Sequence, residues 1–459
     1  MPSIPLTPDE ERKVLKVLGL QNTEDLFSTV PPKIREAADF KIEFGDGYDN
    51  SGRGLTEHEL RLFFGRLADQ NASSNKYTHF LGGGIYDNVV PAIVNQLTLR
   101  GEFLTCYTPY QPEISQGTLQ YIFEFQTMMC RLTGMPIANA SMYDGPSAAA
   151  EAVLMAQRLS PTKTETVLVA GSLSPEYRQV INTFLIGHSK LPTLVPWKAD
   201  STVDLDALSS LIKEHKPCAF VVSYPNYFGS LEDLAVIKQK LPDDCMFIVA
   251  VPDPSALALY EAPGHFGADI VVGEAHQFGT PMLFGGPHVG FFTTRKEYLR
   301  QMPGRVCGES VDINGNRAYT LTLSTREQHI RREKATSNIC TNQGLIALRT
   351  TIYLSFLGKA GLLNLGETNQ SLFDYLKGEL KRVGVHLQFA ESVCYREGVF
   401  KVSNLASRYK KLLAQKIVPG IQLSKYFQDE AFSNSLLITV NPKHTKADLD
   451  KLVEGLSHD

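Results

Sequence analysis

The chain has 459 residues, of which 43% are hydrophobic and 20% are charged. Its 45 basic and 49 acidic side chains give a formal net charge of −4, so there is no overall basic field for nucleic acid or for an acidic membrane surface. The 35 glycines and 25 prolines are near average use, which excludes collagen-like and low-complexity classes. At roughly 100–200 residues per domain, this length indicates a globular enzyme with two or three lobes.

The seven cysteines are odd in number, widely spaced and without a CxxC pair: Cys106, Cys130, Cys218, Cys245, Cys307, Cys340 and Cys394. A disulfide framework or a zinc ribbon needs closer clustering, so we expect reduced thiols, most of them buried, and no metal centre. The N-terminus lacks a basic segment followed by an apolar one, and no apolar run approaches the roughly 20 residues of a membrane span. We therefore expect a soluble, cytoplasmic protein without membrane contacts.

Residues 1–60 are predicted to form an arm of short helices. Thr7 precedes Pro8 and three acidic residues, and Thr56 with Glu59 forms a capping box that opens a helix through Arg66. Further helix starts are expected at 23–27 and 31–35. Such an arm either wraps a partner subunit or packs on its own core, and the sequence leaves both open.

Residues 61–335 are predicted to form a large α/β domain. Apolar runs alternate with segments of helical periodicity, which is typical of a mostly parallel sheet covered by helices on both faces. The expected strands are 166–171, 193–197, 218–224, 246–251, 269–272 and 288–292.

Residues 336–459 are predicted to form a helical connection and a small α+β domain. A long helical region runs to Glu367 and continues over 369–383, and strands are expected at 385–389, 399–402 and 436–440. Thr445 and Asp448 make a capping box for a final helix.

Two polar positions suit a cofactor with a phosphate and a protonated ring nitrogen. Gly145, Pro146 and Ser147 lead into an alanine-rich helix, whose free N–H groups and hydroxyl are able to hold a phosphate. Asp253 follows the strand at 246–251, at the edge of the sheet where ligands collect. The alternatives are a well-capped core helix for Ser147 and a turn or N-cap residue for Asp253.

Two polar segments suit the lining of a site. The loop at 107–117 is fixed by prolines and carries Tyr107, Tyr110, Gln111, Glu113 and Gln116. The segment at 337–342 offers Asn338, Thr341 and Asn342 as hydrogen-bonding groups, with Cys340 among them. The glycine cluster at 82–84 lacks the GxGxxG spacing of a dinucleotide site, and no GxxxxGK[ST] loop is present.

Taken together, the segments resemble the glycine decarboxylase P-protein family of the glycine cleavage system. The similarity is to its N-terminal half, which is a separate alpha subunit (subunit 1) in split bacterial versions. The matching stretches are GGGIYD at 82–87, TPYQPEISQG at 108–117, FQT at 125–127, LTG at 132–134, ANAS at 138–141, FGGPH at 284–288 and TREQHIRREKATSNICTNQ at 325–343.

The resemblance implies fold type I of the pyridoxal-phosphate enzymes, with a seven-stranded sheet in the large domain. It also implies the first step of glycine cleavage. Glycine forms an aldimine with pyridoxal phosphate and loses CO2, and the aminomethyl group passes to the lipoyl arm of H-protein. The cofactor acts as the electron sink, and the protein orients the reactants.

The sequence departs from a complete enzyme of this type at the aldimine lysine. No lysine lies between Lys240 and Lys296, and Gln277 follows His276 where the catalytic half of the family has a His-Lys pair. Glutamine forms no Schiff base, so we expect no catalytic residue in this chain and only a vestigial cofactor pocket at Ser147, Asp253 and His276.

The resemblance therefore implies an alpha subunit that completes the active site of a beta subunit, which carries the lysine and pyridoxal phosphate. The two types of chain are expected to form a heterotetramer of two alpha and two beta subunits. The alpha-subunit residues that line this shared active site at the subunit interface are expected to be Tyr107, Tyr110, Gln111, Glu113, Gln116, Asn338, Thr341 and Asn342. The alternatives are a non-catalytic scaffold and a self-sufficient enzyme with an unconventional lysine such as Lys334.

Overall fold

The computed structural model of the chain describes residues 6–38, 55–187, 191–323, 328–337 and 339–457. Backbone contacts divide the chain into two compact units, residues 1–71 and 72–459. This division differs from the three segments expected from the sequence (1–60, 61–335 and 336–459), whose boundaries stay predictions.

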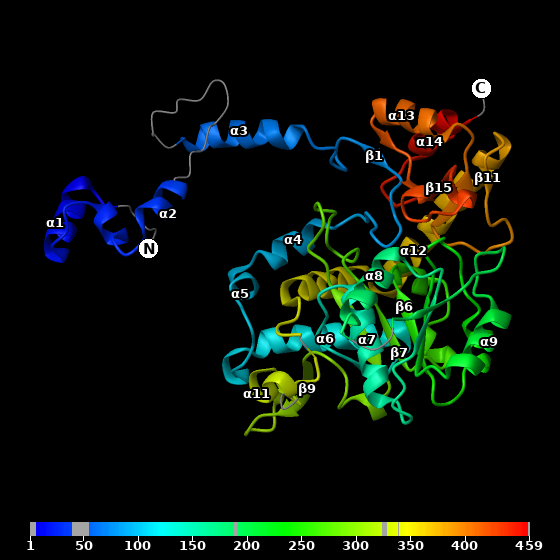
Figure 1. The fold of residues 1–459 in the computed structure, drawn as a ribbon, viewed down its shortest axis with the longest axis horizontal. Coiled ribbons are helices and arrows are strands. Elements are labelled where there is room, and N and C mark those ends of the chain that lie inside the picture. The colour runs from blue at the N-terminus through cyan, green and yellow to red at the C-terminus, as the bar shows by residue number, and fades with distance from the viewer. Residues whose placement is uncertain (1–5, 39–54, 188–190, 324–327, 338, 458–459) are drawn as a thin grey trace. The chain divides into compact units, whose positions relative to one another are not determined.

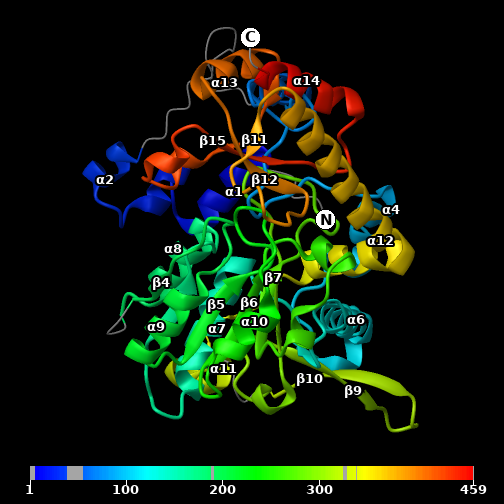
Figure 2. The same cartoon turned by 90° about the vertical axis from the view of Figure 1, so that its right-hand side faces the viewer.

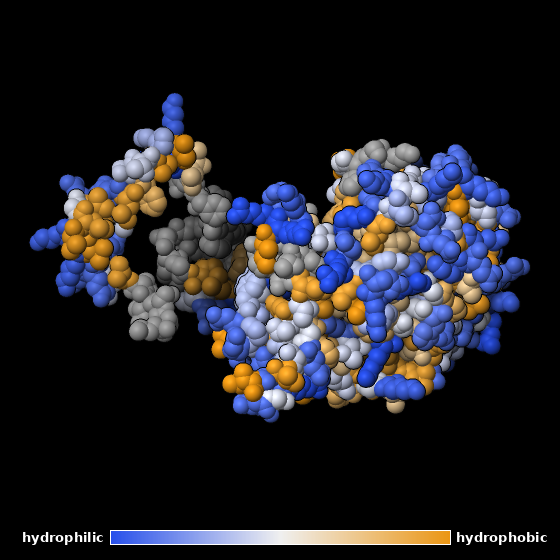
Figure 3. Space-filling view, turned by 90° about the horizontal axis from the view of Figure 1, so that it is seen from below, coloured by the Kyte–Doolittle hydropathy of each residue, from blue (hydrophilic) through white to orange (hydrophobic). Residues whose placement is uncertain are grey.

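The N-terminal unit consists of short helices. They are α1 (Pro8–Leu18), the 3-10 helix η1 (Thr23–Phe27), α2 (Pro32–Ala37) and α3 (Glu57–Asp69). The N-cap predicted at Thr7 and the capping box predicted at Thr56 are confirmed, and in both cases the threonine and the glutamate three residues later bond reciprocally. An N-cap of this kind stabilises a helix by about 1 kcal/mol. Figure 3 shows apolar surface on the N-terminal unit, where Val17 of α1 and Phe27 of η1 are exposed.

The second unit is built on a seven-stranded sheet in the order β2-β8-β7-β6-β5-β3-β4. The strands are β2 (Ile137–Ala138), β3 (Val167–Ala170), β4 (Thr193–Val195), β5 (Ala219–Ser223), β6 (Met246–Val251), β7 (Ile270–Glu274) and β8 (Gly290–Thr294). β3 to β7 run parallel, and β8 runs antiparallel to both of its neighbours. The mostly parallel sheet predicted from the sequence is confirmed, with the seven strands that the resemblance implies.

The strands are continuously apolar because both faces of the sheet are covered. In β6, Phe247, Val249 and Val251 enter one core cluster, and the alternating residues Met246, Ile248 and Ala250 enter another. Successive side chains of a strand point to opposite faces, so each face receives its own core. α7 (Gly145–Leu159) packs across β6, β7 and β8.

The other helices of this part flank the sheet or connect its strands (Figures 1 and 2). They are α4 (Ala92–Thr98), α5 (Gly101–Leu104), η2 (Pro112–Ile114), α6 (Gln116–Thr133), α8 (Pro175–Phe184), α9 (Leu205–His215), α10 (Leu234–Lys240), η3 (Pro254–Ala258), η4 (Pro263–Phe266), η5 (Lys296–Tyr298), α11 (Gln328–Arg331) and η7 (Arg332–Lys334).

A hairpin of β9 (Val306–Val311) and β10 (Arg317–Thr322) extends from the body beside α6, as Figure 2 shows. Asp312 Oδ1 accepts 2.8 Å hydrogen bonds from the backbone N–H groups of Asn314 and Asn316, and Gly315 has φ of 83°. This hairpin was not predicted from the sequence. The Asn314-Gly315 pair is a typical hairpin-turn sequence and could have indicated it.

A long helix, α12 (Gly344–Arg382), leads to the C-terminal lobe. By length and composition alone this helix is able to cross a membrane. Its residues Ile346, Ala347 and Tyr353 belong to the protein core, and Gly358 interrupts it with φ 58° and ψ −168°. We therefore assign α12 to the core.

The C-terminal lobe carries a four-stranded sheet in the order β11-β12-β15-β14. Its elements are β11 (His386–Leu387), β12 (Glu397–Lys401), α13 (Leu405–Ala414), β13 (Ile417–Val418), β14 (Ile421–Gln422), η8 (Leu423–Lys425), η9 (Glu430–Phe432), β15 (Ser435–Thr439) and α14 (Lys446–Leu456). β13 pairs with β1 (Thr78–His79). The three strands and the Thr445 capping box predicted here are confirmed, and the two-residue strands β13 and β14 were not predicted.

Candidate functional site

Asp253 lies directly after β6, at the carboxyl edge of the large sheet, as predicted. Its Oδ1 accepts hydrogen bonds from the backbone N–H of Ser255 (3.1 Å) and from the Ser255 hydroxyl (2.6 Å). The aspartate therefore caps η3, which is the structural alternative raised from the sequence.

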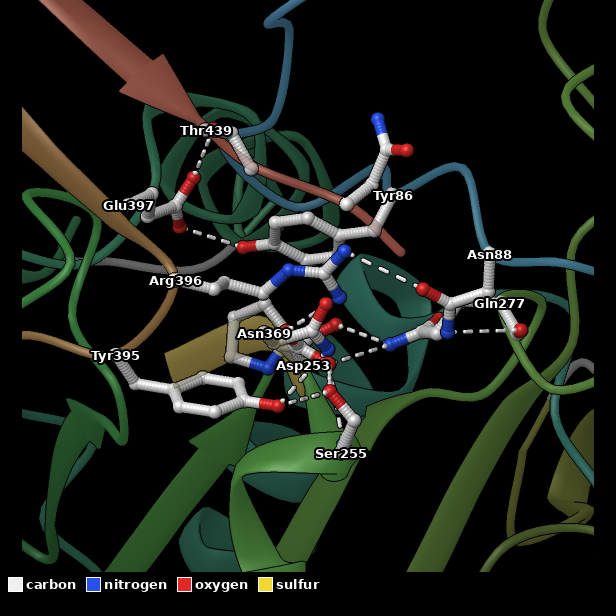
Figure 4. Close-up of polar contacts among 12 residues, drawn as sticks. Tyr86, Asn88, Asp253, Ser255, Gln277, Asn369, Tyr395, Arg396, Glu397 and Thr439 are labelled. Carbon is white, nitrogen blue, oxygen red and sulfur yellow. Dashed lines mark hydrogen bonds and ion pairs between the residues drawn. The ribbon is translucent and has the colours of Figure 1, made fainter. Parts of the chain in front are cut away.

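The guanidinium of Arg396 pairs with the other oxygen of this carboxylate (Figure 4). Arg396 Nη1 lies 3.2 Å from Asp253 Oδ2, and the two side chains are only 1% and 2% exposed. Burial opposes the charge on Arg396, but the facing Asp253 raises the pKa of Arg396 above its ordinary value. The pair is thus a buried ion pair between the C-terminal lobe and the large sheet.

Every polar group of Arg396 is directed at an acceptor. Nε donates to the carbonyl of Val440 at 3.1 Å, and Nη2 donates to Asn88 Oδ1 at 3.3 Å. Its guanidinium carbon lies 4.6 Å from the centre of the Tyr86 ring, which gives a cation–π contact. A buried charge is tolerated when its partners are complete in this way.

Glu397, the next residue, fixes the glycine segment before α4. Its carboxylate accepts hydrogen bonds from the Tyr86 hydroxyl (2.6 Å), Gly83 N–H (2.9 Å) and the Thr439 hydroxyl (2.8 Å). A Cβ on Gly82 would overlap Thr439 Oγ1, so the close approach requires glycine. The glycine cluster at 82–84 thus serves packing against the C-terminal lobe.

The N-terminus of α7 is occupied by carboxylates of the chain itself. Asp144 caps the helix and accepts from Ser147 N–H at 2.7 Å, and the Ser147 hydroxyl donates back to the Asp144 carbonyl at 3.1 Å. Glu274 Oε2 accepts from Gly145 N–H at 3.1 Å. The donors that the sequence analysis assigned to a phosphate are therefore already used.

Glu274 stands at the end of β7 and is the most heavily engaged carboxylate of the region. Its Oε1 accepts from the backbone N–H groups of His276 and Val289, each at 3.0 Å. The Nδ1 atoms of His276 and His288 lie 3.4 Å from Oε1 and Oε2, respectively. Burial opposes ionisation, but these imidazoles lower the pKa of Glu274 to about 2, and Glu274 in turn raises the pKa of His288.

Gln277 is fully buried beside Asp253. Its side-chain Nε2 donates to the carbonyl of Pro252 at 3.1 Å and to Asp253 Oδ1 at 3.4 Å, and its backbone carbonyl accepts from Asn88 Nδ2 at 3.3 Å. The amide thus bonds to the same carboxylate as Arg396 (Figure 4).

The residues of this chain do not fit pyridoxal phosphate, the cofactor that fold type I implies. The group needs an amine for its Schiff base, a carboxylate free to face its ring nitrogen, and free donors for its phosphate. Gln277 supplies no amine, Asp253 is paired with Arg396, and the N-terminus of α7 holds Asp144 and Glu274. The predicted pocket of Ser147, Asp253 and His276 is filled from within.

The structure places the candidate lining residues of the 107–117 loop between α5 and α6. Tyr107 is 82% exposed, and Gln111 and Glu113 are exposed as well. The ring of Tyr110 lies under the Arg305 guanidinium at 5.0 Å, and its hydroxyl accepts from Arg305 Nη2 at 2.9 Å. Four of the five candidates thus lie on one surface loop.

Gln116 differs from the other four because its amide is committed within the chain. Nε2 donates to the carbonyls of Pro112 (2.7 Å) and Tyr319 (2.9 Å), and Oε1 accepts from Tyr319 N–H at 2.9 Å. These bonds fasten the start of α6 to β10.

The second candidate segment lies before α12. Asn342 Nδ2 donates to the carbonyl of Ala140 at 3.3 Å, and Thr341 is partly exposed beside it. Cys340 is exposed, although most of the cysteines were expected to be buried, and its backbone N–H donates to Tyr143 Oη at 2.9 Å. Asn338 lies outside the described residues.

Sequence reasoning missed Arg396, Glu274 and His288. Arg396 is 143 residues from Asp253, so no local pattern links the two. A usable signal was the charged pair Arg396-Glu397 at the start of an apolar strand, since buried charges require partners. For Glu274 and His288 the signal was a carboxylate ending one strand and an imidazole preceding the next.

Comparisons with known proteins cover nearly the whole chain. A family model described as glycine cleavage system P-protein matches residues 1–456. A probable glycine dehydrogenase (decarboxylating) subunit 1 from Aquifex aeolicus is 44% identical over 453 residues, which are 99% of either chain. A protein of the same description from Carboxydothermus hydrogenoformans is 44% identical over 455 residues and 99% of either chain.

Solved structures agree with this similarity. The crystal structure of a glycine decarboxylase (P-protein) of the glycine cleavage system, in inhibitor-bound form, has a TM-score of 0.85 at 37% identity and covers 99% of either chain. A sphingosine-1-phosphate lyase from Burkholderia pseudomallei has a TM-score of 0.64 at 14% identity, over 90% of this chain and 92% of that one. The second likeness shows the fold alone.

Proposed function

Because the chain belongs to the glycine cleavage system P-protein family, we propose that it is the alpha subunit (subunit 1) of a two-subunit glycine decarboxylase. The relatives that match over 99% of their length are named as subunit 1 of a glycine dehydrogenase (decarboxylating). The name implies a second subunit, and the chain is the non-Schiff-base member of the pair.

The observation that carries this proposal is the filled cofactor position. Gln277 lies where the lysine is expected, and Arg396 neutralises Asp253. A chain with this arrangement contributes to glycine decarboxylation through a partner. We assign pyridoxal phosphate and its lysine to that beta partner, glycine to the site there, and the aminomethyl group to the lipoyl arm of H-protein.

The loop between α5 and α6 is the surface that is best suited to contribute side chains to the active site of the beta subunit. Tyr107, Tyr110 and Ile114 are 82%, 55% and 80% exposed, and Leu104 adjoins them at 48%. Clustered exposed apolar and aromatic side chains mark interaction sites. We propose that Tyr107, Tyr110, Gln111 and Glu113, with Thr341 and Asn342, face the beta subunit.

We further propose a cytoplasmic heterotetramer of two alpha and two beta subunits. The ratio of two alpha to two beta subunits is the one that the resemblance to the P-protein family implies. The compartment is supported by seven free cysteines, since an oxidising compartment favours disulfides.

Mixing tests the proposal directly. Purified alpha and beta chains are assayed singly and together for release of CO2 from glycine in the presence of lipoylated H-protein. We expect turnover only in the mixture. Full activity of the beta chain alone would overturn the subunit role, and a borohydride-stable pyridoxyl group on Lys334 of this chain would establish the self-sufficient enzyme instead.

A pair of tyrosine substitutions tests whether the loop between α5 and α6 contributes to the active site of the beta subunit. Tyr110→Phe removes the hydroxyl bonded to Arg305 and keeps the ring, and we expect turnover of the mixture to fall about tenfold or more, with alpha–beta association intact. Tyr409→Phe is the matched control, since it removes a hydroxyl that bonds to the Gly420 carbonyl within the C-terminal lobe. Equal turnover of the two variants would favour the scaffold alternative.

A further inference from the structure

Glu274, His276 and His288 form a cluster beside the filled cofactor position. β7 and β8 pair with Glu274 opposite Gly290, so the turn between them returns His288 to the carboxylate. One ligand atom from each of the three side chains lies within 4.8 Å of the others. The two imidazole rings stand at 75° to one another with centres 5.1 Å apart.

The imidazole of His276 is buried without a hydrogen bond. Its side chain is 3% exposed, and neither ring nitrogen has a hydrogen-bond partner among the residues that the structure describes. Nδ1 of His288 is likewise buried without one in that part of the chain. Buried polar atoms are nearly always satisfied, so these nitrogens point to a ligand that completes the cluster.

The carboxylate retains one acceptor position for such a ligand. Glu274 accepts three backbone hydrogen bonds, from Gly145, His276 and Val289. An ionised carboxylate has about four lone-pair positions, so roughly one remains. It belongs to Oε2, which accepts one of the three bonds and lies 3.4 Å from Nδ1 of His288, whereas Oε1 accepts two and lies 3.4 Å from Nδ1 of His276.

We propose that Glu274, His276 and His288 bind one Zn²⁺ ion. Zinc bonds to nitrogen and oxygen ligands at about 2.0–2.1 Å in tetrahedral geometry, which separates neighbouring ligand atoms by about 3.4 Å. Nδ1 of His288 lies at this distance from Oε2, and Nδ1 of His276 lies at the same distance from the other carboxylate oxygen, Oε1. Two histidines and one glutamate are also a ligand set that zinc uses in proteins with an open fourth position.

The fourth position faces solvent. His288 is one-quarter exposed, and a cavity of about 430 Å³ lies against His276 and His288, with Met282 and Phe284 among its apolar walls. A water molecule or a small anion entering from this cavity completes the coordination. The proposal is independent of the glycine decarboxylase role.

Zinc titration of the metal-free full chain tests the site. Accessible cysteines are first blocked with iodoacetamide, and binding is followed by calorimetry. We expect one Zn²⁺ per chain and at least a tenfold loss of affinity in His276→Gln and in His288→Gln. His265→Gln is the control, because His265 pairs with Glu261 on the surface without a second histidine, and its affinity should equal that of the unchanged chain.

Co²⁺ supplies a second readout that identifies the ligands. The site is supported by visible bands of tetrahedral Co²⁺ without thiolate charge transfer, lost in His288→Gln. Since His288 is partly exposed, this variant tests the proposal even where His276→Gln fails to fold, as judged by circular dichroism. The absence of stoichiometric binding, zinc affinity in both histidine variants equal to that of the unchanged chain, or thiolate bands would overturn the proposal and leave an ion pair of Glu274 and His288.

Discussion

Arg396 Nη1 lies 3.2 Å from Asp253 Oδ2, so the carboxylate that the sequence suggested for a protonated ring nitrogen is paired with an arginine of the chain itself. The side chain comes from the start of β12 in the C-terminal lobe, and the carboxylate from the end of β6. The chain thereby provides its own cation for the aspartate, and this internal replacement is stable only while both members are present.

Removal of Arg396 should destabilise the chain strongly. Arg396→Met leaves Asp253 buried without its counter-ion, and breaking a buried pair from one side costs about 3–5 kcal/mol. Urea unfolding should show this loss, and the double variant Asp253→Asn with Arg396→Met should recover part of it. Arg382→Met removes a surface pair with Glu379 and should leave the midpoint unchanged. If Arg396→Met and Arg382→Met had similar urea midpoints, the buried pair of Arg396 and Asp253 would not be important for stability.

Restoring a lysine should not restore the cofactor site. In Gln277→Lys the new amine meets an aspartate already paired with Arg396 and a helix N-terminus already capped by Asp144 and Glu274. We expect no pyridoxyl adduct at position 277 after incubation with pyridoxal phosphate, borohydride reduction and peptide mapping. An adduct there, at a yield above that of surface lysines, would show that the pocket opens.

His444 should make stability depend on pH. Its Nε2 donates to the His79 carbonyl at 3.0 Å and its Nδ1 accepts from Asn441 N–H at 3.2 Å, which suits the neutral ring. Burial lowers the pKa of His444 to about 4, against about 6.5 in the unfolded chain. Between these values the unfolded chain binds the extra proton, so the contribution of His444 is complete above pH 6.5 and is lost as the pH falls toward 4.

The loss should amount to about 3 kcal/mol across that interval, at about 1.36 kcal/mol per pKa unit. Urea unfolding at pH 7, 5.5 and 4.5 measures it as the difference between the unchanged chain and His444→Gln, whose profile should be flatter. His386→Gln, at an exposed site, should follow the unchanged chain. If stability depended on pH in the same way in the unchanged chain, in His444→Gln and in His386→Gln, the pKa of His444 would be the same in the folded and the unfolded chain.

Thiol reactivity should divide the cysteines by exposure. Cys106 and Cys340 are exposed, while burial raises the pKa of Cys130 and of Cys218 to about 11. Because the thiolate is the reactive form, a short iodoacetamide pulse at pH 7.5 should label Cys106 and Cys340 first. Peptide mapping by mass spectrometry checks the order. Early labelling of Cys218 would contradict its buried position.

The sequence predicted the strands of the large sheet because each is covered on both faces. Runs such as Met246–Val251 are apolar without interruption, and no competing pattern is present. The β9–β10 hairpin was missed because β9 is buried only at its start, which leaves Glu309, Ser310 and Val311 exposed and its alternation weak.

Which side chains occupy the site was harder to predict from the sequence than the strands were. The absent lysine is visible in the sequence, and so is the position of Asp253 after its strand. What fills the space is set by contacts over long separations, such as 143 residues from Asp253 to Arg396 and 129 from Gly145 to Glu274. Periodicity and spacing report on neighbours along the chain, so they do not reveal which distant side chains pair with Asp253 and with the N-terminus of α7.

The three hydrogen-bond acceptors around Arg396 also have a consequence for how the second unit unfolds. Asn88, Asp253 and Val440 belong to the segment before α4, the large sheet and the end of the C-terminal lobe's central strand, and Tyr86 lies on the same guanidinium. Val440 belongs to the same lobe as Arg396, so opening the lobe away from the sheet would separate the guanidinium from the Asp253 carboxylate. A hinge motion between the lobe and the sheet is therefore costly, and residues 72–459 should unfold in a single cooperative transition.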